Sequence, residues 1–121
     1  MAMVRGLRGA TTARDNTREA VLEATNELLE ALVKANDLKM DDLAATFFTT
    51  SPDLNAEFPA VAARQLGWEY VPLICGHEMN VATALPLCIR VMILVNTEKR
   101  PEEMGHLYLR DAKNLRSTGI S

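Results

Sequence analysis

The most apolar stretch of this chain is Leu85-Pro-Leu-Cys-Ile-Arg-Val-Met-Ile-Leu-Val95. The apolar residues alternate onto both faces of an extended chain: Cys88, Met92 and Leu94 on one, and Ile89, Val91, Ile93 and Val95 on the other. Such a pattern is typical of a strand that is covered on both sides. We therefore predict a long buried strand over residues 88–96, and this strand organises the rest of the fold.

Arg90 interrupts that apolar stretch. A guanidinium keeps its charge at any physiological pH, and leaving it unpaired in an apolar setting costs several kcal/mol or so. It therefore needs a partner that is also buried. The pattern alone leaves two interpretations open, a structural salt bridge to an internal carboxylate and a binding site for an anionic ligand.

The rest of the chain alternates between strand and helix patterns. Apolar residues at helical spacing follow a capping-box sequence with Asn16 or Thr17 as the cap, which predicts a helix to about Asn36. Further strands are expected over 4–12, 44–50, 70–75 and 106–109, with short helices near 41–42, over 59–64 and after Pro101. We predict a single domain over 1–121, of class α+β, with a mixed sheet and its helices on one face. From about residue 111 we expect a polar tail, mobile at its end.

Composition excludes several classes of function. The net charge of -3 comes without a basic stripe, which argues against a nucleic-acid partner. The sequence has no apolar run near the ~20 residues of a membrane span and no signal-peptide core, so we expect a cytoplasmic protein without a membrane partner. Cys75 and Cys88 match no zinc or redox spacing, and His77-Glu78 is not the zinc motif His-Glu-x-x-His. We expect two reduced thiols and no bound metal.

The predicted architecture leaves one face of the sheet unexplained. Helices on one face leave the other open, yet the strand over 88–96 is apolar on both. Packing between sheets of several chains would cover it, so we expect an oligomer.

Other polar residues lie in apolar or glycine-rich settings. Arg8 lies in Arg5-Gly-Leu-Arg-Gly-Ala-Thr11, where glycines allow a ligand or another backbone to approach. Arg5 and Arg8 are also consistent with solvated strand residues, and Glu78 with a surface acid. Tyr108, between two leucines, is usually a half-buried structural residue. These residues alone predict an anion-binding oligomer and no particular reaction.

Taken together, the segments resemble the trimeric AroH-type chorismate mutases over nearly the full length of the chain. The resemblance rests on the order and spacing of Arg5-Gly-Leu-Arg-Gly-Ala-Thr-Thr12, Thr50-Ser-Pro-Asp-Leu-Asn-Ala-Glu-Phe-Pro59, Gly67-Trp-Glu-Tyr-Val-Pro72, Cys75-Gly-His-Glu-Met79, Cys88-Ile-Arg-Val-Met92 and His106-Leu-Tyr-Leu109. It implies a homotrimer with a central barrel-like β core and active sites between subunits. It also implies the pericyclic rearrangement of chorismate to prephenate, on the route to phenylalanine and tyrosine, without a cofactor.

The resemblance also implies a role for each matching residue. Arg90 would face the ether oxygen, where negative charge grows as the C–O bond breaks. Arg8 and Tyr108 would bind the side-chain carboxylate of the substrate. Glu78 would accept a hydrogen bond from the ring hydroxyl and favour positive character on the ring.

The remaining matches line the pocket in the family pattern. The binding segment corresponds to Ile74, Cys75, Gly76 and His77, the apolar lining to Phe58, Ala60 and Leu73, and the mouth of the cleft to Arg64, Leu115 and Arg116. Two positions depart from the best-known member of the family. Val61 replaces a lysine at the cleft mouth, so this position supplies no positive charge to bind the ring carboxylate. Ile74 replaces a threonine.

Two alternatives of other classes compete with the enzyme. A non-catalytic trimeric sensor of an anionic metabolite would need Arg8 and Arg90 but would have no use for Glu78. A purely structural trimer would place Arg90 in an internal salt bridge and would tolerate loss of Arg8.

Overall fold

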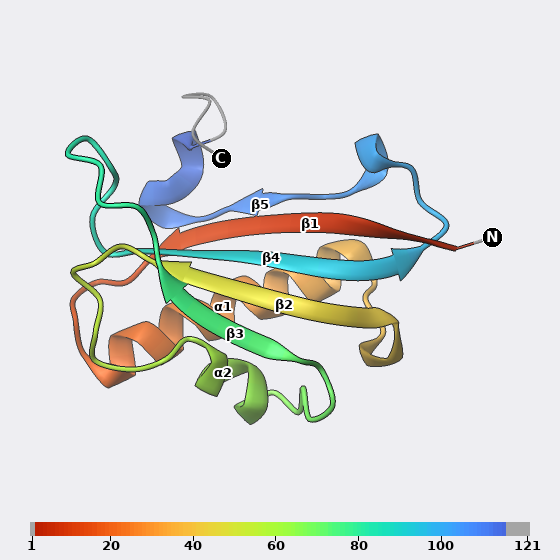
Figure 1. Cartoon of the computed structure of the whole chain (residues 1–121), viewed down its shortest axis with the longest axis horizontal. Helices are drawn as coiled ribbons and strands as arrows, with labels where there is room; N and C mark the ends of the chain where they lie inside the picture. The colour runs from red at the N-terminus through yellow and green to blue at the C-terminus, as the bar shows by residue number, and fades with distance from the viewer. Residues whose placement is uncertain (1, 116–121) are drawn as a thin grey trace.

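The computed structural model describes residues 2–115 of the chain. Five strands form one sheet, with two α-helices and three 3-10 turns around it (Figure 1). In chain order the elements are β1 (Met3–Thr12), α1 (Arg18–Asn36), η1 (Met40–Asp42), β2 (Leu43–Thr50), α2 (Ala60–Gln65), β3 (Leu73–His77), β4 (Cys88–Thr97), η2 (Pro101–Glu103), β5 (Leu107–Tyr108) and η3 (Arg110–Asn114).

The predicted long strand is β4, and it occupies the centre of the sheet. The strand order is β3-β2-β4-β1-β5, so β4 pairs antiparallel with both β1 and β2. The outer pairs, β1 with β5 and β2 with β3, are parallel. The predicted mixed sheet is confirmed.

Helix α1 begins where the capping sequence predicts. Thr17 is the N-cap, and its hydroxyl accepts a hydrogen bond from the backbone N–H of Ala20 at 3.2 Å. The apolar stripe of the helix packs on β1 closely enough to require glycine there. A Cβ atom at Gly9 would lie 2.8 Å from Cδ1 of Leu32, so the buried leucine would have to shift to admit any larger residue there.

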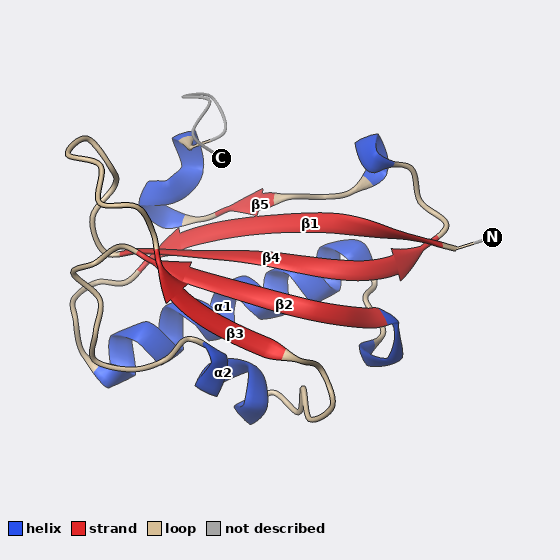
Figure 2. Cartoon of the chain, in the orientation of Figure 1, coloured by secondary structure: helices blue, strands red, loops and turns tan. Residues whose placement is uncertain are grey.

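Both α-helices cover the same face of the sheet (Figure 2). On that face the β4 residues are buried, as in Ile89, Val91 and Ile93. On the opposite face Arg90 and Met92 are only half-buried, and the exposed fraction of Phe47 on β2 is 43%. Helices on one face are thus confirmed, while the expected second layer from neighbouring chains stays a prediction.

Two predicted boundaries differ from the structure. The strand expected over 70–75 begins only at Leu73 and runs to His77, because Tyr70 is 90% exposed and Pro72 has no N–H to give to a ladder. The second is the start of the polar tail expected from residue 111: as far as Leu115 the segment is folded, and the expected mobile end lies outside the described residues. Up to Leu115 the chain forms η3 and buries Ala112 and Leu115, because these two apolar side chains pack together with the buried Cys88.

Candidate active site

A row of side chains crosses the sheet on the face opposite the helices. The strand registers pair Tyr108 with Ala10, Ala10 with Arg90, and Arg90 with Thr49. Residues directly opposite each other in a sheet project from the same face. Tyr108, Arg90 and Thr49, from three different strands, therefore share one surface.

Arg8 lies in the next row on the same face, two residues before Ala10 on β1. Arg8, Thr49, Glu78 and Arg90 line one cavity of about 250 Å³, together with Gly9, Phe47, Val91 and Met92. Three of these side chains, Arg8, Glu78 and Arg90, are charged and were predicted from the sequence as site residues. The structure places all three around one cavity. The cavity holds two guanidinium groups and one carboxylate, so its net charge is positive and suits an anion.

Glu78 is held beside Arg90 by contacts with β2. Its backbone N–H donates to the Thr50 carbonyl at 2.7 Å, and the Thr49 hydroxyl donates to Glu78 Oε2 at 2.8 Å. The same Oε2 lies 3.8 Å from Arg90 Nε. Thr49 was not predicted from the sequence. It was recognisable only once β2 was known to pair with β4 in a register that sets Thr49 opposite Arg90.

The environment of Arg90 differs from that of a dry internal salt bridge. The side chains of Arg90 and Glu78 are 20% and 36% exposed, and their 3.8 Å separation exceeds a normal hydrogen-bond length. Both groups face an open cavity. Of the two interpretations left open by the sequence, this geometry favours the anion site, because an open cavity leaves room for a ligand to reach the guanidinium.

Arg90 also influences the neighbouring thiol. Burial raises the pKa of Cys88 above its ordinary value, and the Arg90 guanidinium offsets that effect only in part through its charge and a hydrogen bond. Burial likewise raises the pKa of Cys75. Both cysteines are free, and neither is a thiolate near neutral pH.

Several predicted pocket residues line a second cavity, of about 340 Å³. These are Phe58, Cys75, Gly76 and His77, with the loop before Pro59 forming much of the wall. None of the four lines the cavity of Arg8 and Arg90 in the same chain. Phe58 is 67% exposed, which is unusual for a phenylalanine with no ligand or partner chain against it.

The other predicted site residues are distributed over both sides of the sheet and α2. Ala60 and Leu73 are half-buried beside the main core, and Ile74 is 59% exposed at the edge strand. The Arg64 guanidinium donates to the Trp68 and Glu69 carbonyls just after α2. Arg116 lies outside the described residues.

Tyr108 lies at one end of the Arg90 row, and Leu115 belongs to the cluster next to it. Leu115 is buried with Ala10 and Cys88, and Tyr108 packs against that cluster. The C-terminal segment therefore packs next to the Arg90 row, and the binding role of Tyr108 stays a prediction.

The chain resembles known proteins in both sequence and fold. The family described as "Chorismate mutase type I" matches residues 4–118. The chain belongs to the type I chorismate mutase family. The chorismate mutase AroH of Bacillus subtilis is 44% identical over 94% of this chain and 91% of its own length. That of Thermus thermophilus is 46% identical over 94% of both chains. A solved structure of chorismate mutase from Clostridium thermocellum superposes with a TM-score of 0.88 at 44% identity, covering 89% of this chain and 96% of that one.

Family membership classifies the chain as an isomerase of aromatic amino-acid biosynthesis. Within residues 2–115, no three His, Cys, Asp or Glu side chains gather in a way that could hold a metal ion. Over the same residues, no helix combines the length and the apolar character that crossing a membrane requires.

Proposed function

We propose that the cavity lined by Arg8, Glu78 and Arg90 is where this chain converts chorismate to prephenate. The observation that carries the proposal is the convergence of two guanidinium groups and one fixed carboxylate in a single cavity. In the reaction the ether C–O bond breaks as a C–C bond forms within the same molecule, so no atom enters or leaves. Such a reaction needs a compact substrate conformation and counter-charge for a polarised transition state.

Arg90 and Glu78 supply the two counter-charges. Negative charge grows on the ether oxygen as its bond breaks, and Arg90 stabilises it. Positive character grows on the ring, and the Glu78 carboxylate stabilises that. The Thr49 hydrogen bond to Glu78, at 2.8 Å, holds the carboxylate in place before substrate arrives, so little reorganisation is needed during the reaction.

Arg8 and Tyr108 bind the side-chain carboxylate of chorismate. The planar fork of an arginine matches the two oxygens of a carboxylate, which fixes orientation as well as position. Arg8 lies on the same sheet face as Arg90, and Tyr108 lies in the Arg90 row. The carboxylate and the ether oxygen of one small substrate can therefore be held at once.

The apolar part of the site comes from a neighbouring chain. Phe58, Cys75, Gly76 and His77 line a cavity of their own, apart from Arg90. We infer a homotrimer in which this second cavity of one subunit faces the Arg90 cavity of the next. Ala60, Leu73 and Ile74 complete the lining, and Arg64 and Leu115 close the mouth near the ring carboxylate. This arrangement gives exposed Phe58 a partner and covers the open face of β4.

A non-catalytic sensor of an anionic metabolite is the second candidate function. Such a protein gains from Arg8 and Arg90 but loses affinity when a carboxylate is fixed beside them, since like charges repel. Glu78 is fixed there by two hydrogen bonds. The enzyme is favoured because it alone has a use for that carboxylate.

We further infer a cytoplasmic location, supported by two free cysteines.

The direct test is to mix the protein with chorismate and follow the loss of its ultraviolet absorbance. We expect turnover that is nearly flat from about pH 5.5 to 9, because arginines stay charged and no proton is transferred. The thiol pKa values are raised, so both thiols stay protonated through neutral pH and add no step there. A bell-shaped kcat centred near neutrality would point to acid–base catalysis by His77 or His106 and contradict the mechanism.

The assembly makes a separate prediction. A single chain leaves Phe58, Ile74 and Phe47 exposed, so the folded protein should be a trimer that gives no stable monomer on dilution. Sedimentation velocity across a thousandfold dilution or so, with activity measured on the same samples, checks this. A folded monomer that retains full activity would contradict both the packing and the shared site.

A further inference from the structure

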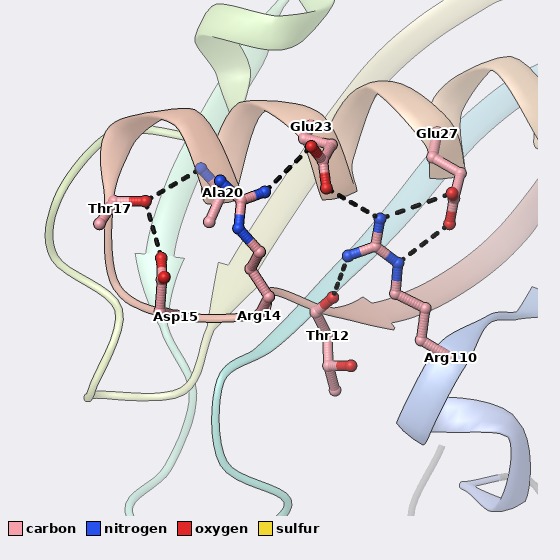
Figure 3. Close-up of polar contacts among 8 residues, drawn as sticks. All are labelled: Thr12, Arg14, Asp15, Thr17, Ala20, Glu23, Glu27 and Arg110. Carbon is pink, nitrogen blue, oxygen red and sulfur yellow. Dashed lines mark hydrogen bonds and ion pairs between the residues drawn. The ribbon is translucent and has the colours of Figure 1, made fainter.

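Arg110 connects three segments that are far apart in the sequence (Figure 3). Its Nη1 donates to the Thr12 carbonyl at the end of β1, at 3.1 Å. Its Nε donates to Glu27 Oε1 on α1 at 3.2 Å, and Nη2 lies 3.5 Å from both Glu27 Oε2 and Glu23 Oε1. One guanidinium thus ties the segment after β5 to β1 and to α1.

A cation between Glu23 and Glu27 reduces the repulsion between their carboxylates. Glu23 and Glu27 lie four residues apart on one face of α1, where two like charges destabilise a helix. Arg110 contacts both carboxylates and is only 28% exposed, so its pairing is less screened than that of a free surface arginine. Arg14 contacts Glu23 alone, at 3.0 Å, and is 53% exposed.

The backbone conformation of Arg110 indicates that specific contacts hold this segment against α1. Arg110 has φ 51°, in the left-handed region that residues with a Cβ rarely adopt. It lies at the junction where β5 ends and η3 begins. A conformation of this kind persists when surrounding interactions determine it, and the contacts of the guanidinium are such interactions.

The segment that Arg110 holds carries Tyr108, which the proposed function assigns to the substrate site. Tyr108 comes two residues before it and lies in the Arg90 row, through Ala10. Leu115 comes after it and is buried against Ala10 and Cys88. A shift of the segment would therefore displace Tyr108 relative to Arg90, and displacements of this kind weaken a site without removing any of its groups.

We propose that Arg110 is a positioning residue for chorismate binding: it locks the segment that carries Tyr108 and Leu115 onto α1 and the end of β1. The inference rests on the proposed function, since it assigns the segment to the substrate site. Arg110 itself touches neither the substrate nor the reacting atoms. It acts by keeping Tyr108 in place relative to Arg90 before the substrate binds.

The test begins with Arg110→Gln in the full-length protein. We expect KM for chorismate to rise roughly tenfold while kcat changes less than about threefold, because Arg90 and Glu78 still face the reacting atoms. The matched control is Arg14→Gln, which removes an ion pair to the same Glu23 but leaves the C-terminal segment tied down. That control should keep both constants near those of the unmodified chain.

A charge swap separates positioning from a loss of overall charge. Arg110→Glu alone should raise KM at least as much as Arg110→Gln. Arg110→Glu combined with Glu27→Arg restores the attraction to α1 with the charges reversed but not the hydrogen bond to Thr12, so we expect it to recover part of the loss in KM. If the double variant is no better than Arg110→Glu, the contact with Glu27 does not position the site.

Amide hydrogen exchange over residues 105–115 gives a readout that does not depend on activity. Exchange there should be faster in Arg110→Gln than in Arg14→Gln, with equal exchange in β4. Unchanged exchange, or an unchanged KM despite faster exchange, would overturn the proposal. If the unmodified chain turns over no chorismate, the proposed function fails instead, and the exchange data still show whether Arg110 locks the segment.

Discussion

We expect Arg90→Lys to lower kcat for chorismate by about 10²–10³-fold or more, in a chain that still folds and assembles. The ether oxygen gains charge only as its bond breaks, so a cation there binds the transition state more tightly than the substrate. Removing one preorganised donor typically costs ~3–4 kcal/mol of transition-state stabilisation. Lysine keeps the formal charge but lacks the planar fork and reaches a different point, so it does not substitute for arginine.

Folding should survive this change because of where Arg90 lies. The side chain borders an open cavity, and the atoms Arg90 Nε and Glu78 Oε2 are 3.8 Å apart. Water can enter such a cavity and solvate a carboxylate that loses its neighbour, which a dry internal salt bridge would not permit. The trimer should therefore form, as sedimentation and circular dichroism can check.

Arg100→Lys is the matched control, since it makes the same chemical change at a side chain that is 73% exposed. Its activity should equal that of the unmodified chain. A folded and nearly fully active Arg90→Lys would show that Arg90 is not the catalytic cation. Outright unfolding of Arg90→Lys would instead favour the structural salt bridge.

The second large effect is expected at Glu78. Glu78→Gln keeps the size of the side chain and an oxygen that can accept from Thr49, but it removes the charge that favours positive character on the ring. We expect kcat/KM to fall on the order of 10²-fold, with Glu78→Ala at least as impaired. Steady-state kinetics with chorismate measure both.

A control variant and a binding measurement show whether the loss of activity in Glu78→Gln is a loss of catalysis. Glu30→Gln removes an exposed carboxylate from α1 and should leave kcat/KM unchanged. If the chain were a sensor, Glu78→Gln would bind the anion at least as tightly and there would be no turnover to lose. Activity within a few-fold of the unmodified chain would contradict the role assigned to Glu78.

The secondary structure was mostly predictable because its signals are local. The alternation of apolar residues over 88–95 predicted β4, and the cap at Thr17 with the following apolar stripe predicted α1. The strand β3 was placed too early, because Tyr70 reads as a strand residue while Pro72, just before Leu73, has no N–H to donate to a ladder. The pairing partner decides such a boundary, and it is not visible in a short window of sequence.

The site was predictable in part. Arg90 stood out from its residue type alone, because an arginine in an apolar strand needs a partner. Arg8, Glu78 and Tyr108 were assigned by family resemblance, and the structure places Arg8 and Glu78 in one cavity with Arg90. Thr49 gave no signal, since a threonine in a strand is ordinary. The links of Arg110 to Glu23 and Glu27 were equally invisible in a segment that reads as a polar tail.

By itself the sequence determined the central strand β4 and the helix α1, which of their residues face the core, and that one buried-strand arginine required a counter-charge. These properties follow from periodicity and from the solvation of a guanidinium, which act over a few residues. Only the tertiary structure decided that β2 and β1 flank β4 and that Glu78 is fixed beside Arg90 through Thr49. It also decided that Arg110 ties the Tyr108 segment to α1. The physical reason is that these contacts join residues 29 to 83 positions apart, and strand order and register bring them within hydrogen-bonding reach.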